Sequence, residues 1–217
     1  MSHEAQKQLA AEHAAALVRD GMRVGLGTGS TVHYVLTALA KRRVRAHYVA
    51  TSPATAHAAA SVGLAIGDFE PDGRLDLAID GADQVNGDGW LIKGAGAALT
   101  REKIVAASAD RFVVIVDSSK LVERLGPPVP VEILRFGAPS TMRRLAPCRE
   151  RDVAESPDGG LIVDHWGEVH EPADLARKLS STPGVIEHGL FAPDLVSEVF
   201  VGVGESVRHI VVKGEHD

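Results

Sequence analysis

This chain has almost no cysteine, few aromatic residues, no long apolar run and no excess of basic charge. Its 217 residues include a single cysteine, Cys148, which excludes an internal disulfide and a cysteine-based metal cluster. No apolar run approaches the ~20 residues of a membrane helix, and the polar N-terminus is unlike a signal peptide. A net charge of -6 offers no basic face for nucleic acid. We therefore expect a cytoplasmic protein that binds neither membranes nor nucleic acid.

Strand and helix patterns alternate along the first half of the chain. Apolar positions recur at helical spacing in the N-terminal segment, which Gly21 is expected to close. Strand patterns beginning at residues 22, 44, 75 and 111 then alternate with helix patterns over 30–42, 53–63 and 98–109. This alternation is typical of an α/β fold, a Rossmann-like parallel sheet with helices on both faces.

The rhythm changes after the proline-rich segment 127–130. The patterns that follow run strand, helix, strand, strand, helix, strand, which is the ferredoxin-like order. We therefore expect a small ferredoxin-like α+β domain at about residues 129–200. Residues 1–128 and about 201–217 would form the larger α/β domain, and the closing segments SEVFVGVG and HIVVKG would rejoin its sheet.

Two short segments lie between a strand and a helix and carry hydroxyl groups. In GLGTGST, residues 25–31, the first helical N–H groups and the Ser30 and Thr31 hydroxyls could bind a phosphate. The alternative is a plain tight turn with Ser30 or Thr31 as the N-cap. TSPAT, residues 51–55, is either a capping turn with Ser52 as N-cap or a hydroxyl-lined pocket wall.

The segment from Asp80 to Glu102, DGADQVNGDGWLIKGAGAALTRE, gathers charge behind the apolar strand LDLAID. Ionised side chains are costly to bury unless they are paired or used, so these residues are candidates for chemistry. The alternative is a loop whose charges are simply solvated. All three segments follow strands, which places them at one edge of one sheet, where α/β proteins bind ligands.

Six segments, in this order and spacing, resemble the type A ribose-5-phosphate isomerase family. They are GLGTGST, DLAIDGADQV, IKGAGAALTREKI, DSSKLV, PVPVEILRFG and PGVIEHGLF, and together they span almost the whole chain. The resemblance implies interconversion of D-ribose 5-phosphate and D-ribulose 5-phosphate in the non-oxidative pentose phosphate pathway. It implies no metal, no organic cofactor, and a homodimer or homotetramer.

The resemblance also implies roles for individual residues. Glu102 matches the catalytic base, which would carry a proton between C2 and C1 through a cis-enediolate. Lys93 and nearby glycine N–H groups would stabilise the oxyanion, and Asp80 or Asp83 would move hydroxyl protons. The phosphate would lie at the Ser30/Thr31 helix start, with Lys120 or Lys7 in reach. The implied substrate-binding positions are Thr28, Gly29, Ser30, Thr31, Asp80, Gly81, Ala82, Asp83, Lys93, Gly94, Ala95, Gly96 and Lys120.

Two positions depart from the family pattern, and two rival functions stay open. Gln84 replaces a usual glutamate and is expected to retune a neighbouring lysine, whereas Ala95 replaces a glycine and matters only at positive φ or in contact with the sugar. The rivals are a non-catalytic sugar-phosphate sensor and another sugar-phosphate enzyme on a similar fold. The ten histidines lack the i, i+4 pairing of a zinc helix, so we expect no metal.

Overall fold

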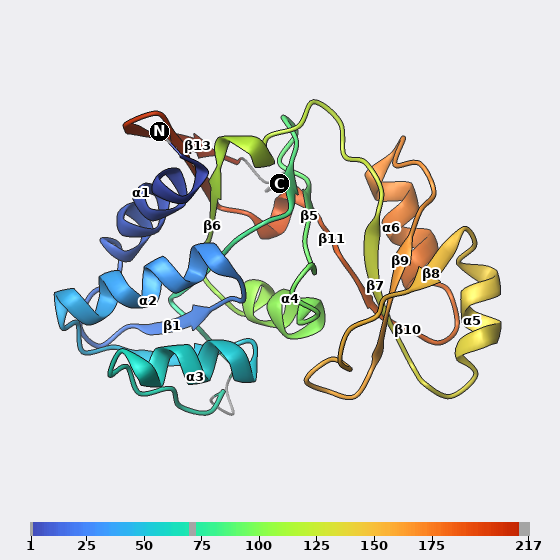
Figure 1. The fold of residues 1–217 in the computed structure, drawn as a ribbon, viewed down its shortest axis with the longest axis horizontal. Helices are drawn as coiled ribbons and strands as arrows, with labels where there is room; N and C mark the ends of the chain where they lie inside the picture. Colours follow the sequence, from blue (N-terminus) through green and yellow to red (C-terminus); the bar gives the residue numbers. More distant parts are fainter. Residues whose placement is uncertain (1, 70–72, 213–217) are drawn as a thin grey trace.

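The computed structural model describes residues 2–69 and 73–212, and it folds into two lobes of unequal size (Figure 1). The larger lobe surrounds a six-stranded, mostly parallel sheet, and the smaller lobe contains a four-stranded antiparallel sheet. The predicted fold class is therefore confirmed. Within the described ranges, none of the helices has both the length and the apolar character needed to cross a membrane.

The six-stranded sheet has the order β13-β12-β6-β3-β1-β2. Its strands are β1 (Arg23–Leu26), β2 (His47–Ala50), β3 (Leu77–Asp80), β6 (Phe112–Asp117), β12 (Glu198–Val203) and β13 (Ser206–Val211). Neighbouring strands run parallel except for β13, which lies antiparallel to β12 at one edge. The closing segments thus rejoin the larger sheet as expected, up to Val212; Lys213 and Gly214 lie outside the described residues.

Helices cover both faces of this sheet, because the buried side chains of its strands alternate between two cores. The helices of the larger lobe are α1 (His3–Ala15), α2 (Ser30–Arg42), α3 (Pro53–Ser61) and α4 (Leu99–Ala107). On β6, Val113 and Ile115 pack with the buried residues of α1 and α2, whereas Val114 and Val116 pack with those of α4. The apolar run of β6 follows from burial on both faces.

The N-terminal helix is shorter than its sequence pattern indicates. It ends at Ala15 with Ala16 as its C-cap, so the expectation that Gly21 closes it is wrong. Gly21 instead occupies a turn at φ +83°, where its N–H donates to the Arg45 carbonyl oxygen just before β1. A helical pattern can continue past the point where the backbone hydrogen bonds stop, because apolar residues after the helix also pack against the core.

The NGDG segment forms a hairpin turn. It joins β4 (Gln84–Val85) to β5 (Leu91–Ile92), which pairs in turn with β11 (Leu190–Phe191) in a three-stranded antiparallel sheet. The Asn86 side chain accepts hydrogen bonds from the N–H groups of Asp88 and Trp90 and so closes the turn. This small sheet joins the two lobes, because β11 follows the last strand of the smaller lobe.

The smaller lobe has the predicted β-α-β-β-α-β order. Its elements are β7 (Val129–Ile133), α5 (Ala138–Arg144), β8 (Cys148–Glu150), β9 (Leu161–His165), α6 (Pro172–Ser180) and β10 (Val185–His188), with the sheet order β10-β7-β9-β8. The expected boundary near residue 200 falls inside β12, which belongs to the larger sheet. We therefore propose that the smaller domain ends at His188.

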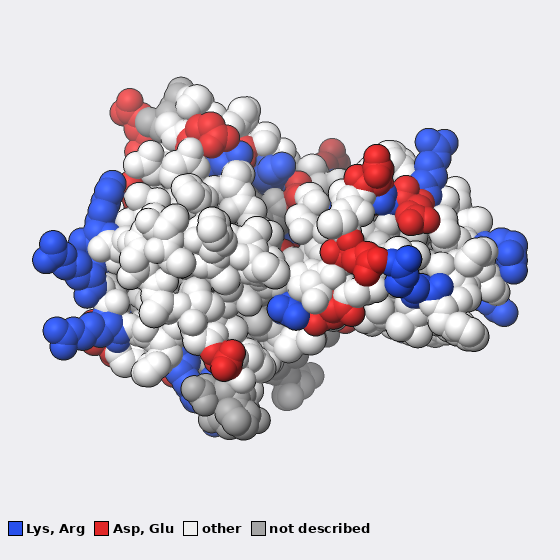
Figure 2. Space-filling view, turned by 60° about the horizontal axis from the view of Figure 1, so that its bottom comes forward, with Lys and Arg blue, Asp and Glu red and all other residues white. Residues whose placement is uncertain are grey.

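The surface view in Figure 2 shows the same two lobes from below. On this face the middle of the larger lobe is mostly uncharged, and acidic and basic side chains are interspersed over the smaller lobe. The face therefore presents no broad area of positive charge of the kind that nucleic acid requires.

The chain turns at the carboxyl edge of the larger sheet to form the candidate site. The loop after β1 leads into α2, β3 ends at Asp80, and β6 leads into the short 3-10 helix η1 (Ser118–Lys120). A second 3-10 helix, η2 (Pro193–Leu195), lies between β11 and β12. Because parallel strands bring their carboxyl ends to one edge, these loops converge there.

Candidate active site

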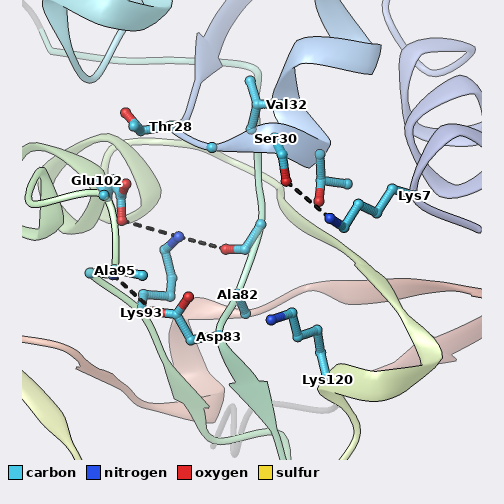
Figure 3. A pocket seen from close by; sticks show the side chains of 15 residues that line it. Lys7, Thr28, Ser30, Val32, Ala82, Asp83, Lys93, Ala95, Glu102 and Lys120 are labelled. Carbon is cyan, nitrogen blue, oxygen red and sulfur yellow. Dashed lines mark hydrogen bonds and ion pairs between the residues drawn. The ribbon is translucent and has the colours of Figure 1, made fainter. Parts of the chain in front are cut away.

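A cavity of about 180 Å³ opens at this edge (Figure 3). It is lined by Lys7, Thr28, Gly29, Ser30, Thr31, Val32, Gly81, Ala82, Asp83, Lys93, Gly94, Ala95, Gly96, Glu102 and Lys120. Every predicted site position except Asp80 therefore lies on its wall. Val32 is an addition that the sequence reasoning missed, because an apolar residue in the first turn of a helix carries no chemical signal.

The start of α2 forms one wall of the cavity. Gly29, at φ +132°, is the N-cap, and no side chain caps the helix. The interpretation of Ser30 or Thr31 as an N-cap is therefore wrong, and both residues line the cavity. The Ser30 Oγ accepts a hydrogen bond from Lys7 Nζ at 3.2 Å, and the same ammonium lies 2.7 Å from Glu4 Oε1. A helix N-terminus beside an ammonium group is suited to an anion.

The TSPAT segment supports the cavity from behind. Ser52 caps α3 by accepting the Thr55 N–H at 3.1 Å, and Pro53 occupies the first turn, so the capping interpretation is confirmed. The Thr28 Oγ1 lies 2.9 Å from both Thr51 Oγ1 and Ser52 Oγ. Since Thr51, Ser52 and Thr55 are buried and do not line the cavity, their hydroxyls fix the Thr28 loop rather than contact a ligand.

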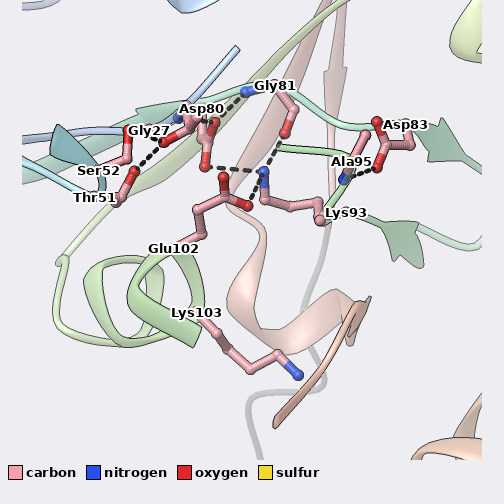
Figure 4. Close-up of polar contacts among 12 residues, drawn as sticks. Gly27, Thr51, Ser52, Asp80, Gly81, Asp83, Lys93, Ala95, Glu102 and Lys103 are labelled. Atoms are coloured by element: carbon pink, nitrogen blue, oxygen red, sulfur yellow. Dashed lines mark hydrogen bonds and ion pairs between the residues drawn. The ribbon is translucent and has the colours of Figure 1, made fainter. Parts of the chain in front are cut away.

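Two carboxylates and one ammonium group lie buried together at the centre of the site (Figure 4). Lys93 Nζ is 2.9 Å from Asp80 Oδ2 and 3.1 Å from Glu102 Oε2, and it donates to the Gly81 carbonyl oxygen at 2.5 Å. The side chains of Lys93 and Glu102 are each 3% exposed. Glu102 Oε2 contacts the Lys93 ammonium as an ion pair whose geometry does not meet the criteria of a hydrogen bond, and among the described residues it has no other donor.

Asp80 lies behind the cavity wall and is fully engaged by the protein. Its Oδ1 accepts the N–H groups of Gly81 at 2.7 Å and Thr28 at 3.2 Å, while its Oδ2 faces Lys93. A Cβ on Gly27 would lie only 1.8 Å from the Asp80 Cγ, which explains the glycine at that position. The end of β3 thus delivers its carboxylate to the loop backbone and Lys93 and not to the open cavity.

The charges of this group shift one another's pKa values. Burial, followed by the charge of Asp80, raises the pKa of Glu102 to about 8, although Lys93 opposes the shift. Burial also raises the pKa of Asp80. Burial alone would lower the pKa of Lys93, but Asp80 and Glu102 outweigh it and raise that pKa, so Lys93 stays charged. A glutamate with a pKa of about 8 can accept and return a proton near neutral pH.

The glycine-rich loop after β5 runs beside this group. The Asp83 Oδ2 accepts the Ala95 N–H at 3.0 Å and so ties the DGAD segment to the loop. Ala95 is not among the residues with positive φ, so its methyl group causes no backbone strain. Gln84 exchanges two 2.8 Å hydrogen bonds with the Gly126 backbone and does not line the cavity; that it retunes a neighbouring lysine stays a prediction.

A second buried cation anchors α4 to the smaller lobe. Lys103, next to Glu102, points away from the Lys93–Glu102 pair (Figure 4), and its Nζ lies 2.7 Å from Glu187 Oε1 and 2.6 Å from the His188 carbonyl oxygen. Burial lowers the pKa of Lys103. Burial also lowers the pKa of His188, to about 4, and the nearby positive charge of Lys103 lowers it further. His188 is therefore neutral, and its Nδ1 accepts the Leu190 N–H at 3.2 Å, which shapes the turn between β10 and β11.

The described residues contain no group of three or more His, Cys, Asp or Glu side chains arranged to hold a metal ion. The site thus combines a helix N-terminus and lysines at one end with two buried carboxyl groups and an ammonium group at the other. The fold and the site define an α/β protein with a polar cavity suited to an anionic ligand.

The comparisons with known proteins give this class a family. A family model described as "Ribose 5-phosphate isomerase A (phosphoriboisomerase A)" matches residues 47–206. Ribose-5-phosphate isomerase A of Gluconobacter oxydans is 44% identical over 220 residues, which cover 94% of this chain and 95% of the relative. The enzyme of Caulobacter sp. (strain K31) is 42% identical, with coverages of 97% and 100%.

Solved structures agree with the sequence relatives. Ribose 5-phosphate isomerase A from Neisseria gonorrhoeae superposes with a TM-score of 0.92 at 32% identity, covering 98% of this chain and 99% of that chain. A D-ribose-5-phosphate isomerase in complex with phospho-erythronic acid has a TM-score of 0.91 at 33% identity, with coverages of 97% and 100%. The chain belongs to the ribose-5-phosphate isomerase A family.

Replacing Lys93 by Met tests the buried ion group. The variant leaves two buried carboxyl groups without a cation, which we expect to cost ~3–5 kcal/mol of unfolding free energy. Because burial raises the carboxyl pKa values in the folded state, the folded protein binds protons more tightly than the unfolded chain. The loss is therefore larger at pH 8 than at pH 5, where protonation neutralises the pair. Urea unfolding at both pH values measures it.

Lys41→Met, at an exposed position on α2, is the matched control and should change little at either pH. An equal loss for Lys93→Met at both pH values would show that the two carboxyl groups are not coupled to the ammonium group as described.

Proposed function

We propose that this chain interconverts D-ribose 5-phosphate and D-ribulose 5-phosphate through a cis-enediolate, with Glu102 as the base. The observation that carries the proposal is the buried carboxylate of Glu102 at the cavity wall, which is paired with the Lys93 ammonium and has a pKa raised to about 8. A single carboxylate in this state can take the proton from C2 and deliver it to C1. The family relatives carry the name of this activity.

Lys93 and the loop that follows it are placed to stabilise the developing negative charge. The Lys93 ammonium lies 3.1 Å from Glu102 Oε2, and Gly94 to Gly96 line the same cavity. Charged and backbone donors that are fixed before the reaction stabilise an enediolate oxygen without reorganisation. We assign Lys93 and the loop N–H groups to this role.

The two aspartates divide the remaining work. Asp83 lines the cavity, so we assign it to the sugar hydroxyl groups, including the proton moved when the ring opens. Asp80 does not reach the cavity, and we assign it to holding Lys93 charged and in place. This narrows the sequence-based expectation, in which either aspartate could move hydroxyl protons.

The phosphate site is proposed at the other end of the cavity. Ser30, Thr31, Lys7 and Lys120 line that wall, and the first turn of α2 presents its N–H groups there. The relative solved with phospho-erythronic acid shows that a protein of this fold accepts a phosphorylated sugar acid. Phosphate binding would hold the sugar while the chemistry proceeds at Glu102. We further propose that the enzyme acts in the cytoplasm as a homodimer or homotetramer, which sedimentation would measure.

Replacing Glu102 by Gln tests the base. The amide keeps the size of the side chain but cannot take the proton, so kcat should fall by ~10²–10⁴-fold. The assay follows ribulose 5-phosphate formation from ribose 5-phosphate, with and without a chelator, and wild-type activity should not depend on the chelator. A folded Glu102→Gln variant with near-native turnover would remove Glu102 from this role.

Replacing Lys120 by Ala tests the phosphate end. The variant should raise the apparent KM about tenfold, equivalent to ~1.4 kcal/mol, with a smaller effect on kcat. Lys178→Ala, on the exposed side of α6, is the matched control. An unchanged KM in Lys120→Ala would place Lys120 outside the substrate site.

A further inference from the structure

The smaller lobe contacts the glycine-rich loop of the cavity through one arginine that no sequence motif singles out. Arg151 directly follows β8, and its Nη1 donates to the carbonyl oxygens of Gly94 at 2.8 Å and Ala95 at 3.3 Å. Both acceptors belong to the segment 93–97, here called the oxyanion loop. Although Arg151 comes from the smaller lobe, its guanidinium group thus reaches the backbone of the cavity wall.

Arg151 is itself held in a fixed orientation. Its Nε donates a hydrogen bond to Oδ2 of Asp164 on β9 at 3.0 Å, and its Nη2 donates to Oδ1 of the same carboxylate. The two side chains thus form a bidentate ion pair. The Arg151 and Asp164 side chains are 16% and 15% exposed. A planar guanidinium held by a carboxylate on one side directs its remaining donors in a defined direction. Here that direction is toward the oxyanion loop.

The oxyanion loop needs such support because its backbone is unusual. Gly94 has φ +109°, and Ala97, which has a side chain, has φ +57°. Residues held in left-handed conformations persist only where surrounding contacts fix them. The loop is fixed from the larger lobe by Asp83, which accepts the Ala95 N–H, and from the smaller lobe by Arg151.

The contact at Ala95 sets the direction of a backbone donor. In a planar trans peptide, the N–H of Gly96 points opposite to the carbonyl of Ala95. Since that carbonyl faces Arg151, the Gly96 N–H is directed away from the smaller lobe, and Gly96 lines the cavity. Across residues 2–69 and 73–212, this N–H donates to no protein acceptor, so it is free to bind an oxygen of a ligand.

We propose that Arg151 is a positioning residue for the isomerase reaction: from the smaller lobe it holds the oxyanion loop so that the Gly96 N–H meets the enediolate oxygen. The inference rests on the proposed function. The guanidinium group touches no substrate and acts through the Gly94 and Ala95 carbonyl groups. Its loss therefore affects the transition state, where the oxyanion develops, more than the binding of the ground-state sugar phosphate.

The test is steady-state kinetics of Arg151→Met, which keeps an unbranched apolar stem but has no donors. Removing an oxyanion donor outright costs ~10²–10³-fold in kcat, and displacing one should cost less. We expect a loss of about tenfold or more with KM within a factor of about three. Arg149→Met, on exposed β8 two residues earlier, is the matched control and should stay at wild-type values.

Two milder variants keep the test decisive if Arg151→Met does not fold. Arg151→Lys retains the charge but cannot form the bidentate ion pair. Asp164→Asn retains the arginine but fixes its orientation less firmly. Each should show a kcat below that of wild type, at unchanged KM and with little change in Tm. Wild-type kcat in both folded variants would overturn the proposal.

Two further outcomes also overturn it. A kcat for Arg151→Met equal to that of Arg149→Met means that the loop keeps its geometry without the arginine. A rise in KM that exceeds the fall in kcat means that Arg151 acts on substrate binding instead. Wild type and Glu102→Gln are measured alongside, so absence of isomerase activity in the wild type, which would refute the proposed function, is distinguished from failure of the Arg151 proposal.

Discussion

The buried Lys93 ammonium group, held between Asp80 and Glu102, is the interaction on which the rest of the site depends. Its members come from three separate elements, the end of β3, the residue after β5 and the first turn of α4, so satisfying it fixes how these elements meet. Buried charges are tolerated only when they are paired in good geometry. The constraint extends outward to Gly27, where any side chain would collide with the Asp80 carboxylate.

The same group accounts for the proposed chemistry. Burial and the charge of Asp80 raise the pKa of Glu102, whereas the two carboxyl groups keep Lys93 charged. Proton transfer and oxyanion stabilisation then need no metal in principle, because a base of suitable pKa and a fixed positive charge lie together. The smaller lobe anchors the two segments that hold these groups. It contacts α4 through Lys103 and the oxyanion loop through Arg151.

Much of this arrangement follows from local sequence pattern. The alternation of strands and helices predicts a parallel sheet, parallel strands bring their loops to one edge, and the charged segment 80–102 lies at that edge. Other features could not be predicted in this way. The depth of Asp80 depends on how the Thr28 and Gly81 N–H groups turn onto its carboxylate, and two-residue strands such as β4 and β5 are too short for a periodic signal. Arg151 contacts residues more than fifty positions earlier in the chain, and nothing in CRERDVAE distinguishes it from an exposed arginine.

The ionisation of Glu102 in the substrate-free protein provides the most direct test. Infrared difference spectra collected across a pH titration, with Glu102→Gln as the reference, resolve the carboxyl and carboxylate bands of this one side chain. If burial and the charge of Asp80 govern it, the midpoint lies at a pKa of about 8. A midpoint at the ordinary glutamate pKa, near 4.5, would contradict the buried ion group as the source of its basicity.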